Sequence, residues 1–207
     1  MYFDIGSNIG LWAKANIYKT NTIISIEASP KTYLQLVENC KDTRRIMCLN
    51  YTVCDNNGAD VVFYDCDISP ISSLNKDWLS HPNSRFEGYK NQITEITCKS
   101  ITIDKLIQLY GKPELIKIDV EAAEYTVVKS LTQKVQHLCF EWASECKDIS
   151  YQCLDHLLGI GFTKFYVQFE DHYTFRPEEN QYAGIDEAKH ILNNTEIKKH
   201  WGMVWCM

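Results

Sequence analysis

Short apolar runs alternate with amphipathic segments along most of the chain, and this alternation constrains the fold more than any other feature. We expect strands at 2–5, 22–28 and 46–53, and the same pattern returns at 113–120 and 135–142. Strands that alternate with helices form β-α-β units, which build a parallel sheet with helices on both faces. We therefore predict an α/β fold whose ligands bind at the carboxyl ends of the strands.

The stretch 65–92 interrupts this alternation, because it is rich in Ser, Asn and Asp and shows no sustained period. A chain of 207 residues lies in the one-domain range. We predict a single domain with a cofactor-binding half at 1–64, a long loop at 65–92 and an acceptor-side half at 93–207. Loops of this length are usually functional or mobile.

Composition narrows the class of protein. The chain carries 27 acidic and 21 basic residues, a formal net charge of −6, which argues against a nucleic-acid partner. No run approaches the roughly 18 apolar residues of a membrane span, so we expect no membrane partner. The nine cysteines form no C-x-x-C pair and lie mostly in apolar runs, as free thiols in a reducing compartment do. We therefore predict a cytoplasmic protein.

A glycine turn follows the first apolar run, with the sequence Asp4-Ile5-Gly6-Ser7-Asn8-Ile9-Gly10. Dinucleotide sites use G-x-G-x-x-G, which seats a pyrophosphate on a helix N-terminus. Here the spacing is G-x-x-x-G, and Asp4 would repel an anion and attract a cation. The turn therefore favours an adenosyl ligand that has a positive charge and no phosphate, a description that fits S-adenosylmethionine. The alternative is a plain tight turn in which Asp4 caps the loop.

Glu27 ends the second predicted strand, about 20 residues past the glycine turn. An acid at this position can accept hydrogen bonds from both ribose hydroxyls, because a carboxylate offers two acceptor oxygens. The third strand should supply the surroundings of the adenine, which makes Val53, Cys54 and Asp55 candidates. These three residues are equally well explained as a strand that ends in a polar turn.

Several segments occur together in one order, namely the glycine turn, Ile26-Glu27-Ala28-Ser29-Pro30, Ser72-Ser73-Leu74, Ile101-Thr102-Ile103-Asp104-Lys105-Leu106 and Leu115-Ile116-Lys117-Ile118-Asp119-Val120-Glu121-Ala122-Ala123-Glu124. In this order they resemble the FkbM family of S-adenosylmethionine-dependent methyltransferases over residues 1–142. The resemblance implies a Rossmann-like class I methyltransferase sheet of seven mostly parallel strands, in the order 3-2-1-4-5-7-6 with the last strand antiparallel. It implies a cofactor site lined by Asp4, Gly6, Asn8, Gly10 and Glu27, to which we add Ser7 and Ala28.

Two departures from the family pattern bear on the site. Ala122 stands where the family usually has glycine, so the backbone of that turn should differ slightly. Met1 lies three residues before Asp4, so we expect no upstream segment that closes the cofactor pocket. We expect a pocket that is open, or closed by 65–92 or by a partner subunit in a homo-oligomer, or else a trimmed chain.

Carboxylates should crowd the sheet edge beside the cofactor. Period two along 113–120 places Lys117 and Asp119 on one face, and Glu141 ends the next strand. We predict Asp119, Glu141 and Glu121 as catalytic residues, since clustering raises carboxylate pKa values toward those of a general base. The alternative is that Asp119 and Glu141 cap neighbouring backbone. Lys117 should pair with a carboxylate, and we assign no metal because no ligand spacing demands one.

We therefore hypothesise an S-adenosylmethionine-dependent methyltransferase that acts on a hydroxyl. The family resemblance implies a sugar, glycan or small-molecule acceptor. Two alternatives stay open, an RNA methyltransferase with a local basic groove and a catalytically silent binding module of the same fold.

Overall fold

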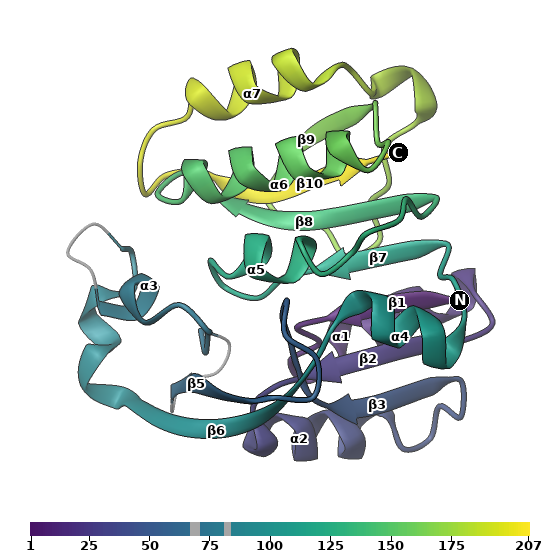
Figure 1. Ribbon diagram of the computed structural model, residues 1–207, viewed down its shortest axis with the longest axis vertical. Coiled ribbons are helices and arrows are strands. Elements are labelled where there is room, and N and C mark those ends of the chain that lie inside the picture. Colours follow the sequence, from purple (N-terminus) through teal and green to yellow (C-terminus); the bar gives the residue numbers. More distant parts are fainter. Residues whose placement is uncertain (67–70, 81–83) are drawn as a thin grey trace.

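A seven-stranded sheet forms the centre of the computed structural model, which describes residues 1–66, 71–80 and 84–207 (Figure 1). Its strands lie in the order β3-β2-β1-β7-β8-β10-β9. Their bounds, in that order, are Ile46–Asn50, Ile23–Glu27, Tyr2–Ile5, Leu115–Ile118, His137–Ala143, Trp201–Cys206 and Phe165–Phe169. The first five are parallel to one another, and β10 is antiparallel to both of its neighbours. This confirms the predicted fold class and strand order.

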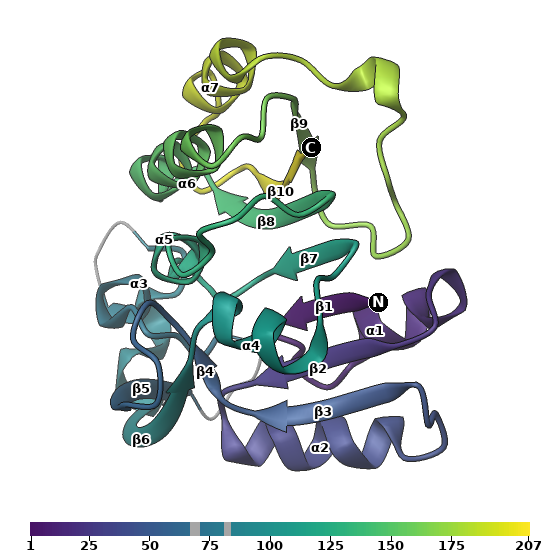
Figure 2. The same ribbon diagram turned by 45° about the vertical axis from the view of Figure 1, so that its right-hand side comes forward.

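Alternate residues of each strand face two separate apolar cores. On β1, for example, Phe3 belongs to the core covered by α4, α5, α6 and α7, whereas Tyr2 belongs to the core covered by α1 and α2. Figure 2 shows these helices on opposite sides of the sheet. The helices span Leu11–Asn16 (α1), Pro30–Cys40 (α2), Ile103–Tyr110 (α4), Glu124–Val128 (α5), Lys147–Gly159 (α6) and Ile185–Asn193 (α7). In the described ranges, no helix is long and apolar enough to cross a bilayer.

The helix that follows β2 begins where the sequence indicates. Ser29 accepts a hydrogen bond on Oγ from the Thr32 amide, and Pro30 occupies the first helical position. A capping hydroxyl and a proline with preset φ both favour a helix start at this point. Because α2 begins at Pro30, only three residues after β2 ends, Glu27 stays at the carboxyl end of β2.

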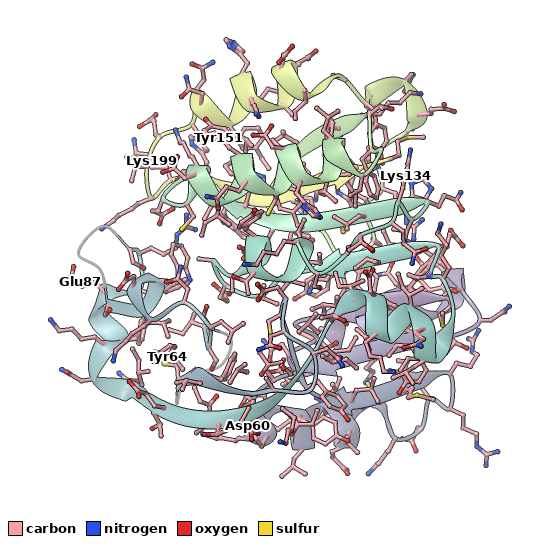
Figure 3. The ribbon with its side chains drawn as sticks, viewed as in Figure 1. Asp60, Tyr64, Glu87, Lys134, Tyr151 and Lys199 are labelled. Atoms are coloured by element: carbon pink, nitrogen blue, oxygen red, sulfur yellow. The ribbon has the colours of Figure 1, made fainter. Side chains whose placement is uncertain are left out.

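A small sheet stands beside the main one, and two of its strands flank the stretch 65–92. It has the order β4-β6-β5, with β4 at Thr52–Val53, β5 at Asp60–Cys66 and β6 at Ile93–Ile101. The third predicted strand, 46–53, is therefore split, since β3 ends at Asn50 and β4 pairs with β6. Figure 3 labels Asp60 and Tyr64 on β5, and Glu87 at the start of the 3-10 turn that directly precedes β6.

The segment between β5 and β6 also contains helix α3, Lys76–Ser80, and the 3-10 turn η2, Glu87–Gln92. Trp78, Leu79 and Ile71 are buried there in a third apolar core, against which Phe86 packs. Residues 67–70 and 81–83 of the predicted loop lie outside the described residues. We call residues 52–66, 71–80 and 84–101 the small sheet module.

A substitution at Gly10 tests how tightly the glycine turn packs on α2. Its φ is +85°, and a Cβ there would lie 2.7 Å from Leu36 Cδ1 and 2.9 Å from Cys40 Sγ. We expect Gly10→Ala to lower the free energy of unfolding by roughly 2–4 kcal/mol, from left-handed strain plus overpacking, in urea titrations. Gly58→Ala is the control, because its φ is +75° and no atom lies within 4 Å of the added Cβ. Equal losses in the two variants would contradict the packing argument.

Candidate active site

A cavity of about 710 Å³ opens at the carboxyl ends of β1, β2 and β7. Six of the predicted cofactor residues line it, namely Gly6, Ser7, Asn8, Glu27, Ala28 and Val53. The three predicted catalytic residues, Asp119, Glu121 and Glu141, line it as well. The structure therefore gathers both predicted groups around one space.

The glycine turn is held between β2 and β7 by backbone contacts. The amides of Gly6 and Ser7 both donate to the Ile26 carbonyl at 3.0 Å. Gly6 has a φ of +76°, and a Cβ there would lie only 1.7 Å from the Asp119 carbonyl oxygen. Glycine is required at this position because the backbone of the next strand occupies the side-chain space. The turn thereby offers its backbone to the cavity.

Glu27 is tied to the turn through both carboxylate oxygens. The Asn8 amide donates to Oε2 and the Ser29 amide donates to Oε1, each at 2.9 Å. Glu27 is 8% exposed, and burial raises its pKa to about 7 against the lowering effect of these two amides. A carboxylate has about four lone-pair sites, so Glu27 keeps acceptor capacity for two further hydroxyls.

Asp4 lies behind the turn and does not line the cavity, which corrects its predicted position. It is fully buried and pairs with Lys117, whose Nζ lies 3.4 Å from Asp4 Oδ1 and 3.1 Å from Asp119 Oδ2. The same Nζ donates to the Gly6 carbonyl at 3.3 Å. Burial lowers the pKa of Lys117, but the charges of Asp119 and Asp4 outweigh burial and raise it. Lys117 thus has the carboxylate partners that the sequence predicted.

Three other predicted cofactor residues, Gly10, Cys54 and Asp55, also lie away from the cavity lining. Gly10 serves the packing of the turn on α2, because Leu36 and Cys40 fill the space beside it. Asp55 is 44% exposed in its side chain and forms an ion pair with Lys129 at 2.7 Å. The chain turns away after β4 ends at Val53, and this turn carries Asp55 away from the cavity.

Asp119, Glu121 and Glu141 bring one carboxylate oxygen each within 4.8 Å of the others. Burial and the nearby Asp119 charge raise the pKa of Glu121 to about 8, and the same two causes raise the pKa of Glu141. A carboxylate whose pKa approaches neutrality is suited to take a proton from a substrate. Hard oxygen ligands also suit magnesium, but partly exposed acidic groups are common without an ion, and we assign none.

The cavity has further lining residues beyond the predicted cofactor and catalytic groups. Trp12, Tyr51, Trp201 and the loop 171–174 contribute to its wall. Asn16 joins this loop to α1, because its Nδ2 donates to the Tyr173 carbonyl at 2.8 Å. Contacts between residues so far apart in the chain leave no local pattern that a single sequence could reveal.

Comparison with known proteins identifies the family. Residues 4–192 match the model described as the Methyltransferase FkbM domain. The chain belongs to the FkbM methyltransferase family. Its cofactor is accordingly S-adenosylmethionine, as the sequence predicted. The turn and Glu27 fit this cofactor, because Glu27 has acceptor oxygens for the ribose hydroxyls, and the amides of Gly6, Ser7 and Asn8 already donate to protein acceptors rather than to a phosphate.

A curated relative of this FkbM domain is the hexuronic acid methyltransferase AglP of Haloferax volcanii. The two are 30% identical over 141 residues, which are 67% of this chain and 52% of AglP. The chain thus spans about half the length of that relative.

Two solved structures align with the whole chain at lower identity. Aeropyrum pernix fibrillarin, solved with natively bound S-adenosyl-L-methionine, is 11% identical over 65% of its own length, with a TM-score of 0.48. Precorrin-6y C5,15-methyltransferase from Geobacter metallireducens is 8% identical over 78% of its length, with a TM-score of 0.49.

We expect Glu27→Ala to weaken S-adenosylmethionine binding by roughly 1.5–3 kcal/mol, the range for a hydrogen bond to a charged group. Titration calorimetry measures this loss. Glu38→Ala is the matched control, since Glu38 lies on the exposed side of α2 and pairs with Lys41. Unchanged affinity in Glu27→Ala would exclude Glu27 from the cofactor site.

Proposed function

We propose that this chain transfers a methyl group from S-adenosylmethionine to a hydroxyl oxygen of a sugar, glycan or other small metabolite. The observation that carries the proposal is the shared cavity. Glu27 stands on one side of it and the cluster of Asp119, Glu121 and Glu141 on another. A hydroxyl acceptor needs such a cluster, because its proton must leave as the new bond forms.

S-adenosylmethionine supplies an electrophilic methyl group on a positively charged sulfur. As the hydroxyl oxygen forms its bond to the methyl carbon, the carbon–sulfur bond breaks and its electron pair stays on sulfur. Glu141 accepts the hydroxyl proton, and Asp119, held by Lys117 at 3.1 Å, orients the hydroxyl. A cation in the cavity favours ionised carboxylates, so the bound cofactor prepares Glu141 to act as the base.

We expect the acceptor to be a sugar. Trp12, Tyr51, Tyr173 and Trp201 line the same cavity as the carboxylates and add aromatic surface to it. Such surfaces bind the apolar faces of sugar rings, while carboxylates accept hydrogen bonds from sugar hydroxyls. The name of the relative AglP, a hexuronic acid methyltransferase, supports a sugar acceptor.

The proposal is tested by transfer of a labelled methyl group to a panel of neutral sugars, amino sugars and uronic acids. We expect label in a product that withstands mild alkali, as a methyl ether does. Loss of the label in alkali would mean that the enzyme esterifies a carboxylate. Cofactor binding without any transfer would favour the silent binding module.

Glu141→Gln tests the base directly. It keeps the shape of the side chain and removes its capacity to accept a proton, so we expect methyl transfer to fall about 10²–10⁴-fold. Affinity for S-adenosylmethionine, measured by calorimetry, should change little. Glu38→Gln, on the exposed side of α2, is the control and should transfer at the normal rate. A rate for Glu141→Gln within a few-fold of the original protein would rule out Glu141 as the base.

A further inference from the structure

One side chain of the small sheet module reaches the carboxylate cluster from outside the cavity. Trp78, on α3, donates from its indole Nε1 to Glu121 Oε2 at 3.1 Å. Trp78 is 5% exposed and is absent from the cavity lining, whereas Glu121 lines the cavity. The indole therefore acts on the site only through the Glu121 carboxylate.

The backbone beneath this carboxylate is strained. Glu121 and Ala122 have φ values of +56° and +62°, in the left-handed region that side chains other than glycine disfavour. Ser73 Oγ donates to the Glu121 carbonyl at 2.5 Å, and Asn75 Nδ2 donates to the Ala122 carbonyl at 3.0 Å. Residues 73–78 thus hold both the turn and the carboxylate that it carries.

Trp78 is itself fixed in place. Its ring packs edge-on against Phe86 with centroids 5.3 Å apart, inside the third apolar core. Arg85, next to Phe86, forms a two-pronged ion pair with Glu145, with Nε–Oε1 at 2.7 Å and Nη2–Oε2 at 2.6 Å. Glu145 is nearly buried, so this pair anchors the module firmly to the segment that follows β8. The indole donor is consequently preorganised.

We propose that Trp78 is a positioning residue, whose indole N–H holds the Glu121 carboxylate in one orientation at the acceptor end of the cavity. Its consequence for methyl transfer rests on the proposed function. The hydrogen bond itself does not, and it can be measured without an acceptor.

The charges around Glu121 determine how its pKa changes when the hydrogen bond from Trp78 is removed. Burial and Asp119 at the end of β7 raise its pKa, the Trp78 indole lowers it, Glu124 on α5 raises it and Arg85 lowers it. Glu141 on β8 lies in the same cluster and is a further negative neighbour. The pKa of Glu121 is about 8 with the indole in place. Removal of the donor leaves burial and the three acids opposed by Arg85, so the pKa rises further.

The test is the variant Trp78→Phe, which keeps an aromatic ring in the core and removes the N–H. Carbon-13 NMR of the Glu121 carboxyl carbon, assigned with Glu121→Gln, gives the titration midpoint in the protein without acceptor. We expect the midpoint to rise by about one pH unit or more. Trp205→Phe is the matched control, because its indole donates to the uncharged Gln168 Oε1 at 2.7 Å. It should leave the Glu121 midpoint unchanged.

An unchanged midpoint in Trp78→Phe, or an equal rise in Trp205→Phe, would overturn the proposal. If Trp78→Phe does not fold, NMR of the original protein still tests the proposal. The Trp78 indole N–H resonance should titrate together with Glu121 and lose that titration in Glu121→Gln. A flat resonance between pH 6 and 10 would overturn the proposal.

Methyl transfer then separates this inference from the proposed function. In Trp78→Phe, kcat should fall several-fold because Glu121 is no longer held in the carboxylate cluster at the acceptor end, while KM for S-adenosylmethionine changes less than two-fold. A shifted titration with an unchanged kcat would overturn the positioning role. A shifted titration in a protein that transfers no methyl group would reject the proposed function and leave the indole bond established.

Discussion

The rest of the site depends on one buried cation. Lys117 lies between Asp4 on β1 and Asp119 after β7, and it also donates to the Gly6 carbonyl. A buried charge is tolerated only with partners, and removal of one partner leaves the others uncompensated at high cost. The ammonium group therefore fixes the glycine turn against the end of β7, which places the cofactor end and the acceptor end of the cavity at a set separation.

The same arrangement explains why so many acids occupy one cavity. Lys117 is committed to Asp4 and Asp119, so Glu121, Glu141 and Asp171 keep raised pKa values, chiefly through burial. Such crowding is costly in the free protein, and a cationic ligand relieves it. The small sheet module also restricts the position of Glu121, because residues 73–78 hold the turn that carries this side chain.

Local sequence was informative wherever a function depends on neighbouring residues. The short strands and the turn at Gly6 followed from spacing and side-chain chemistry, and the order of the sheet from the family resemblance. Contacts between residues far apart in the chain could not be predicted in this way. The Trp78–Glu121 bond joins residues 43 apart and the Asn16–Tyr173 bond residues 157 apart, and neither leaves a periodic signal. The sequence also could not show that Asp4 is buried away from the cavity, because its burial depends on how β7 packs beside β1.

A crystal structure of the complex with S-adenosylmethionine tests the central claim most directly, namely that one cavity holds the cofactor at Glu27 and presents its methyl group to the carboxylate cluster. The account predicts both ribose hydroxyls within hydrogen-bond distance of the Glu27 carboxylate. It also predicts a methyl group that faces Asp119 and Glu141. A ribose bound elsewhere, or a methyl group directed away from that cluster, would contradict it.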